Sequence, residues 1–179
     1  QPSVSRSEYD AAIQQIKEHI ALGNTYQVNY TMRLNNSFQG DAWELFLRLA
    51  QAQQAPYAAY VDTGRFALCS ASPELFFIQD GEKLTSKPMK GTAARGYTLE
   101  QDQAQAEWLH NSEKNRAENV MIVDMIRNDM GRVARIGSVH VPRLFDVERY
   151  PTVWQMTSTV TSETDASFVE IMAALFPCA

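Results

Sequence analysis

The feature that most constrains the fold is a change of hydrophobic periodicity between residues 57 and 87. Short apolar runs alternate there with two polar turn sequences, Asp62-Thr63-Gly64 and Gln79-Asp80-Gly81-Glu82. Asp and Gly favour tight turns between antiparallel strands, because glycine adopts the positive φ that such turns require. The pattern therefore predicts a meander of antiparallel hairpins that leads directly to Lys90.

Helical periodicity dominates on both sides of this meander. Apolar residues spaced three or four apart predict amphipathic helices over residues 7–23, 41–53, 98–111, 112–130 and 165–177. We expect Ser7 and Asp10 to form a capping box at the start of the first helix. In the fourth helix, the apolar residues expected to face the core are Val120, Ile122, Met125 and Ile126.

Further strands are predicted where β-branched and aromatic residues cluster, over residues 25–38, 138–142 and 145–161. Helices and mostly antiparallel strands therefore occur in blocks rather than in strict alternation. This order predicts an α+β fold, in which antiparallel sheets are flanked by helices.

Composition excludes several classes of function. A net charge of −5 and a pI near 5.2 argue against a nucleic-acid surface, which needs clustered Lys and Arg. Two cysteines and three scattered histidines give neither a disulfide framework nor a zinc-ligand spacing. No apolar run approaches the roughly twenty residues that span a bilayer. We expect a cytoplasmic protein without nucleic-acid or membrane partners.

Lys90 is the leading candidate for a catalytic residue. It stands in Lys87-Pro88-Met89-Lys90-Gly91-Thr92, where a lysine at a strand end can serve as an amine nucleophile. Lysine loses its proton near neutrality only when it is desolvated or lies beside another positive charge, and Lys87 and Arg95 are close in sequence. The alternative is an ordinary solvated surface lysine.

Two carboxylates and one turn complete the candidate site. Glu74 opens the apolar run 75–78 and can act as a general acid or base, or can simply face water from an edge strand. Glu118 can supply one carboxylate to Mg²⁺, with a second ligand needed, or can form an i,i+4 salt bridge with Lys114. Gly91 and Thr92 offer backbone N–H groups and a hydroxyl to a substrate carboxylate.

Three motifs together resemble a known family. They are Ser70-Ala71-Ser72-Pro73-Glu74-Leu75-Phe76, the segment from Lys87 to Gly96, and the segment from Ser112 to Val133. In order and spacing they are similar to the chorismate-binding catalytic module of anthranilate synthase component I and aminodeoxychorismate synthase component I. The resemblance implies that residues 1–179 are a partial module, without its C-terminal part and its usual N-terminal segment.

Two positions indicate a branch of this family. Lys90 stands where anthranilate synthases have alanine, and its surroundings are similar to the Pro-Ile-Lys-Gly-Thr of aminodeoxychorismate synthases. Gln27 stands where isochorismate and salicylate synthases have a lysine that activates water. The resemblance therefore implies amination of chorismate at C4, with Lys90 as nucleophile and Glu74 as the proton-transfer group.

The same resemblance implies a cofactor and a partner. Glu118 would hold Mg²⁺, and ammonia would come from a separate glutamine amidotransferase subunit. Gln155 would contact the substrate at a position where many relatives have histidine. The alternatives are anthranilate formation, with amination at C2 and loss of pyruvate, and a non-catalytic fragment that serves only structure or partner binding.

Overall fold

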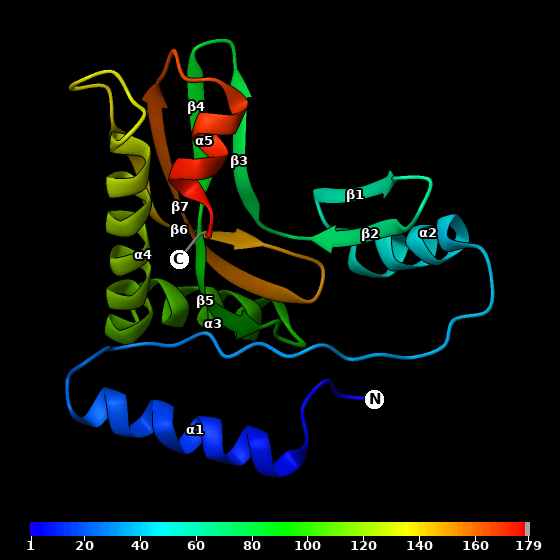
Figure 1. Cartoon of the computed structure of the whole chain (residues 1–179). Coiled ribbons are helices and arrows are strands. Elements are labelled where there is room, and N and C mark those ends of the chain that lie inside the picture. Colours follow the sequence, from blue (N-terminus) through cyan, green and yellow to red (C-terminus); the bar gives the residue numbers. More distant parts are fainter. Residues whose placement is uncertain (178–179) are drawn as a thin grey trace. The chain divides into compact units, whose positions relative to one another are not determined.

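The computed structural model describes residues 1–177 (Figure 1). The helices of this part are α1 (Arg6–Ala21), α2 (Ala42–Gln53), α3 (Leu99–Asn111), α4 (Glu113–Gly131) and α5 (Phe168–Leu175). Its strands are β1 (Tyr57–Asp62), β2 (Ala67–Ser72), β3 (Leu75–Asp80), β4 (Lys83–Lys87), β5 (Met89–Ala94), β6 (His140–Arg149) and β7 (Val153–Glu163). All strand pairs are antiparallel, which confirms the predicted α+β class.

The chain divides into two compact units, Gln1–Asp41 and a larger unit that begins at Ala42. In the first unit, the N-cap of α1 lies two residues earlier than the sequence suggests. Ser5 is the N-cap and forms the capping box with Glu8, so the prediction of Ser7 and Asp10 is wrong. Asp10 instead pairs with Arg6, one helical turn before it, at 2.8 Å.

The strand predicted over residues 25–38 is also wrong. Only Leu34 makes a bridge there, an isolated one with Pro2, and the rest of the segment belongs to no strand of the described chain. Its large apolar residues are exposed, with Tyr26 at 62% and Leu34 at 75%. β-propensity alone does not make a strand, because each backbone N–H and C=O needs a neighbouring strand.

The predicted meander is two hairpins that belong to different sheets. β1 and β2 form a two-stranded sheet that packs on α2, with Trp43 and Phe46 of the helix against Tyr60. β3 and β4 belong to a five-stranded sheet of order β3-β4-β7-β5, in which β6 also pairs with β7. The chain passes from one sheet to the other at Pro73 and Glu74.

β7 is the central strand of the larger sheet. Along one edge it pairs with β4 and then β5, and along the other edge it pairs with β6 (Figure 1). The predicted break between two C-terminal strands, at residues 143–144, lies instead at 150–152. Phe145 has a φ of 63° in β6, where the register with β7 shifts, so an irregularity inside one strand resembled a loop in the sequence.

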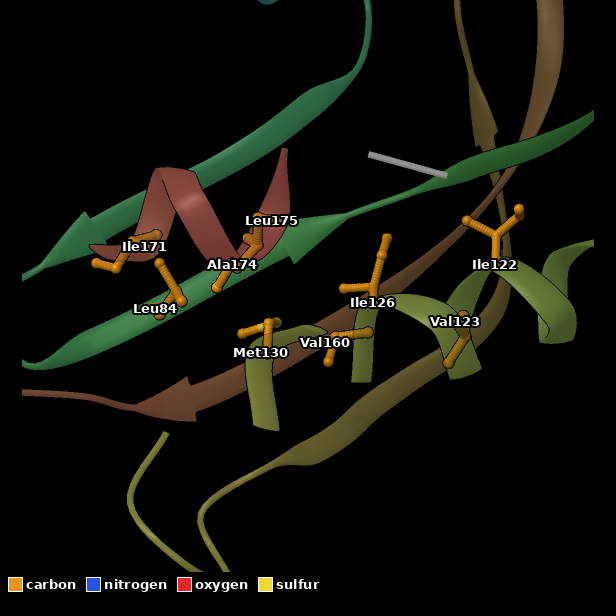
Figure 2. Packing of buried hydrophobic residues seen from close by; sticks show 9 residues of the cluster. All are labelled: Leu84, Ile122, Val123, Ile126, Met130, Val160, Ile171, Ala174 and Leu175. Carbon is orange, nitrogen blue, oxygen red and sulfur yellow. The ribbon is translucent and has the colours of Figure 1, made fainter. Parts of the chain in front are cut away.

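The core lies between α4, α5 and the sheet (Figure 2). Its buried residues are Leu84, Ile122, Val123, Ile126, Met130, Val160, Ile171, Ala174 and Leu175. The prediction for α4 is right for Ile122 and Ile126 and wrong for Val120 and Met125, which are 37% and 38% exposed. Asn119, Val123 and Met130 occupy the inner face instead, because buried positions follow the three- and four-residue helical spacing.

The last helix is shorter than the predicted range 165–177. Ser167 caps α5 and forms a capping box with Glu170, so Asp165 lies before the helix. No helix within residues 1–177 is long and apolar enough to cross a membrane.

Candidate active site

Lys90 lies at a bulge in β5. Met89 pairs with Thr157 and Thr92 with Gln155, so three steps along β5 match two steps along β7. The extra residue falls at Lys90 and Gly91, where the ladder is interrupted. Lys90 is half-buried, and its ammonium makes no ion pair within residues 1–177. A bulge of this kind redirects side chains, which suits a reactive group.

Glu74 is brought next to this bulge from the start of β3. Its Oε1 accepts a hydrogen bond of 2.8 Å from the backbone N–H of Met89, the residue before Lys90. Ser72 fixes the turn that carries Glu74, because its Oγ accepts from the Glu74 N–H at 3.2 Å. The structure therefore bonds Glu74 to the residue that precedes Lys90, and Glu74 remains exposed to solvent.

A cavity of about 510 Å³ opens beside Glu74. Its walls come from β3, β4, α4 and the residues that follow α5, and they include Leu75, Ile122, Ile126 and Phe176. Pro88, two residues before Lys90, also lines it. A mostly apolar hollow of this size with a carboxylate in its wall has the dimensions of a small-molecule site.

Gly91 is required for two separate reasons. Its φ of 99° lies in a region that other residues avoid, and a Cβ there would stand 3.0 Å from Cβ of Asn115 in α4. Asn115 in turn bonds to Ser112, the N-cap of α4, through its Nδ2 at 2.9 Å. The bulge is therefore packed directly against the first turn of the helix that carries Glu118.

Thr92 and Gln155 form a second pair of predicted site residues. They are cross-strand partners, and the Thr92 hydroxyl donates to Gln155 Oε1 at 2.9 Å. Gln155 also pairs with Glu148 of β6. Because side chains alternate along a strand, Gln155 lies on the face opposite Met156, which packs with Leu109 of α3. Thr92, Gln155 and Glu148 thus share one face of the sheet.

Lys87 does not act as a free positive charge beside Lys90. Its Nζ bonds to Glu148 Oε1 at 2.5 Å, and both side chains are about three-quarters buried, with 26% and 28% of their surface exposed. Arg95 is also paired, with Asp102. Each of these two cations therefore has its own carboxylate partner, and neither is a free positive charge next to Lys90.

Tyr150 joins this group, although the sequence gave no reason to select it. Burial raises the pKa of Tyr150 to about 12, assisted by the charge of Glu148, by a hydrogen bond to that residue and by the charge of Glu74. Its hydroxyl therefore stays protonated over the physiological range and remains a donor. Only the strand register shows that Glu148 and Tyr150 belong to this group, because Glu148 lies 61 residues from Lys87 in the sequence.

A buried network anchors the start of α3 to the sheet. Arg95 donates two hydrogen bonds to the Asp102 carboxylate, of 2.7 and 2.5 Å. Trp154 donates to the same carboxylate at 2.9 Å. The hydrogen bonds from the Arg95 guanidinium are the main reason why the pKa of Asp102 lies well below its usual range. The Gly96 N–H adds a further bond of 2.9 Å. This network fixes both ends of the loop that follows β5.

A second buried network links α4 to the residue pair before Lys90. Asn119 is fully buried and accepts a bond of 2.5 Å from the Ser158 hydroxyl. The Ser158 N–H donates to the Pro88 carbonyl at 3.1 Å. Within residues 1–177 the Asn119 Nδ2 has no partner. No sequence signal distinguished Asn119 from an exposed helical asparagine.

Glu118 is apart from the other predicted residues. Its carboxylate is 44% exposed and lies 3.9 Å from Lys114, the i,i+4 pair expected from the spacing. Within residues 1–177 no three His, Cys, Asp or Glu side chains are grouped to hold a metal ion. The described donors therefore do not form a coordination shell, and the role of Glu118 as a Mg²⁺ ligand stays a prediction.

Comparison with known proteins gives a consistent result. The profile of the chorismate binding enzyme family matches residues 1–179. Aminodeoxychorismate synthase component 1 of Escherichia coli is 41% identical over 179 residues, which are 99% of this chain and 40% of that protein. The chloroplastic aminodeoxychorismate synthase of Arabidopsis thaliana is 44% identical over 98% of this chain and 20% of its own length.

A solved structure shares the fold. Anthranilate synthase component I from Streptococcus pneumoniae superposes with a TM-score of 0.84 at 24% identity, over 97% of this chain and 38% of that one. The chain thus spans about 40% of the length of the bacterial relative it matches. The activity of the complete protein is therefore an inference from this segment.

Proposed function

The chain belongs to the family of chorismate-binding enzymes, and from this premise we propose that it is part of an enzyme that aminates chorismate at C4, as in aminodeoxychorismate synthase component I. The observation that supports this most is the placement of Lys90 at a bulge, one residue from the Met89 N–H that Glu74 binds at 2.8 Å. Glu74 and Pro88, which stands two residues before Lys90, both line one cavity, and this supports a proton-transfer group close to the proposed nucleophile.

In the proposed reaction, the Lys90 amine attacks C2 of chorismate. The two conjugated ring double bonds shift, and the hydroxyl at C4 leaves with a proton from Glu74, as water. Ammonia then attacks C4, the two double bonds shift back, and the C2–N bond to Lys90 breaks. Chorismate and ammonia thus give 4-amino-4-deoxychorismate and water, and Lys90 is regenerated.

Glu74 suits the acid role through its position. Its Oε1 is held by the Met89 N–H, which leaves the other carboxylate oxygen free of hydrogen bonds within residues 1–177. A carboxyl group that is fixed by one oxygen can present the second to a substrate hydroxyl. Its exposure allows the proton to be replaced from solvent after each turnover.

Gly91, Thr92 and Gln155 would bind the acidic substrate. The Thr92 hydroxyl is oriented by its bond to Gln155, and the bulge leaves backbone N–H groups near Gly91 outside the regular ladder. Such groups are suited to a carboxylate. Gln155 can donate and accept hydrogen bonds and carries no charge, so it would orient rather than protonate the substrate.

Glu118 would contribute one ligand to Mg²⁺ in the complete protein. When bound, Mg²⁺ would neutralise the charge of a substrate carboxylate. The other ligands would come from outside the described residues. Ammonia would come from a glutamine amidotransferase subunit, as the resemblance implies, and a cytoplasmic location remains a prediction.

The decisive experiment is identification of the product. The natural protein that contains residues 1–179 would be incubated with chorismate, Mg²⁺ and ammonium, and the products identified by mass spectrometry. A product with an amino group at C4 and pyruvate retained supports the proposal. Anthranilate would assign the protein to the C2 branch instead, and absence of any product would favour a structural role for the segment.

A further inference from the structure

The ladder does not hold Lys90 in place. Between Met89 and Thr92, β5 has one residue more than the facing segment of β7, and the extra residue has no registered partner. A side chain at such a position depends for its direction on whatever fixes the strand before and after it.

The chain on both sides of Lys90 is bonded to the same pair of cross-strand partners, Glu148 and Gln155. Three residues before it, Lys87 Nζ bonds to Glu148 Oε1 at 2.5 Å. Two residues after it, the Thr92 hydroxyl bonds to Gln155 Oε1 at 2.9 Å. Glu148 and Gln155 are themselves registered partners in β6 and β7. We call this closed set of four residues, Lys87, Glu148, Gln155 and Thr92, the bracket.

The Lys87–Glu148 side of the bracket spans an intervening strand. β4 and β6 are not neighbours, since both pair with β7, on opposite edges. The side chains of the pair are 26% and 28% exposed, so water competes with their contact less than at an open surface. Tyr150 hydrogen-bonds to Glu148 as well, and its high pKa keeps it a donor. Glu148 is thus held from two directions.

We propose that the Lys87–Glu148 ion pair, supported by Tyr150, is a positioning device that closes the bracket and holds the β5 bulge in the geometry in which Lys90 reacts. Lys87, Glu148 and Tyr150 act through Lys90 and touch no reacting atom. The inference rests on the proposed function, because it assumes that Lys90 is the nucleophile. The proposal thereby gives a role to three residues that take no part in the proposed chemistry themselves.

The first test is Glu148→Gln in the natural protein that contains this chain. We expect kcat per folded molecule to fall about 100-fold, the loss that a displacement of about 1 Å produces, while KM for chorismate changes less than about threefold. The folded fraction is measured by near-UV circular dichroism. The rate at which an amine reagent modifies Lys90, followed by mass spectrometry, should also change, which a loss of folded protein alone does not produce.

A double-mutant cycle identifies the pair as the cause. Lys87→Met should lower kcat as Glu148→Gln does, and the double variant should be no worse than either single one, because both remove the same contact. Lys87→Arg keeps the charge and should stay within about threefold of the wild type. Glu82→Gln, which removes a 2.8 Å ion pair between the β3–β4 turn and Arg135, is the matched control and should leave kcat unchanged.

Three results would overturn the proposal. One is wild-type kcat in Glu148→Gln. Another is losses that multiply in the double variant, which would mean that the two residues act separately. The third is that Glu148→Gln and Lys87→Met fail to fold while Lys87→Arg is fully active, which would assign the pair to the fold. Failure of the proposed function is distinct, because it appears as the wrong product from the wild-type protein.

Discussion

Gly96 donates its backbone N–H to the Asp102 carboxylate at 2.9 Å, and its Cα lies against the first turn of α3. A Cβ at Gly96 would stand 2.2 Å from the backbone nitrogen of Asp102. Since a backbone atom cannot give way as a flexible side chain can, the loop between β5 and α3 must move if any other residue replaces glycine.

Gly96→Ala should therefore destabilise the protein by about 3 kcal/mol, as expected for overpacking against a rigid neighbour. Urea unfolding measures the change. Gly131→Ala is the control, because nothing lies within 4 Å of a Cβ at the end of α4. That variant should be neutral or slightly stabilised. Equal effects of the two substitutions would contradict the close approach at Gly96.

Asp102→Asn should lower the melting temperature by about 5 °C or more, because it leaves the half-enclosed Arg95 guanidinium without its counter-charge. The exposed pair Asp124–Arg127 supplies the control, and Asp124→Asn should have little effect.

The effect of Asp102 should depend on pH with a definite sign. Its pKa is lowered in the folded protein, chiefly by the hydrogen bonds from Arg95, so the ionised group stabilises the fold above its ordinary pKa of 3.8. That contribution disappears as pH falls from this value through the lower folded-state pKa. The melting temperatures of wild type and Asp102→Asn should thus converge below about pH 4. A difference that widens in acid would contradict this assignment.

Lys90→Ala in the natural protein should abolish or redirect amination of chorismate while the fold stays intact. Removing an amine nucleophile leaves no group to form the bond at C2. Product analysis by mass spectrometry, with a thermal melt, separates the two effects. Lys83→Ala at the start of β4 is the control lysine and should retain the wild-type product. An unchanged rate in Lys90→Ala would remove Lys90 from the mechanism.

Gly91→Ala should cost stability by about 2 kcal/mol, from the strain of positive φ together with the contact to Asn115. Gly64→Ala isolates the first contribution, since Gly64 has a φ of 75° and nothing within 4 Å of its Cβ. We expect about 1 kcal/mol for that control. Chemical denaturation of both variants measures the difference, and equal losses would show that Asn115 offers no resistance.

Glu118→Gln should raise the Mg²⁺ concentration needed for half-maximal turnover by at least about tenfold, because a neutral amide is a weaker ligand for a hard cation. Glu113→Gln, in the first turn of the same helix, is the control. Titration of activity with Mg²⁺ gives both values. Identical titrations for the two variants would place the metal ligand elsewhere.

The helices that flank the site were predictable because their signals are local. The third and fourth helices were predicted to begin at residues 98 and 112, and Thr98 and Ser112 cap α3 and α4 there with their own side chains. Glu74 and Lys90 were also predictable as candidate site residues, since each lies in a short motif whose residue types suit a chemical role. The mutual placement of Glu74 and Met89 came from the structure alone.

What the sequence did not reveal depends on contacts between distant strands. The segment 25–38 has the composition of a strand, yet within residues 1–177 it forms no ladder and makes a single isolated bridge, from Leu34 to Pro2. The residues before Lys90 were predicted to form one continuous meander. At Pro73 the chain passes from one sheet to the other, and in the sequence this turn resembles a hairpin turn. Glu148 and Tyr150 gave no signal, because the register that brings them to Lys87 is set by β7.

The dependence of the sheet on β7 also affects the order in which the site can form during synthesis. β5, which carries Lys90, has β7 as its strand partner, and among the strands of residues 1–177 β7 leaves the ribosome last. Until Thr157 has been made, β5 therefore lacks its complete partner strand in the described part of the chain. At roughly 5–20 residues per second, the nascent chain waits several seconds with this segment unpaired. The arrangement of Lys90 and Gly91 at the β5 bulge can therefore form only at the end of that interval.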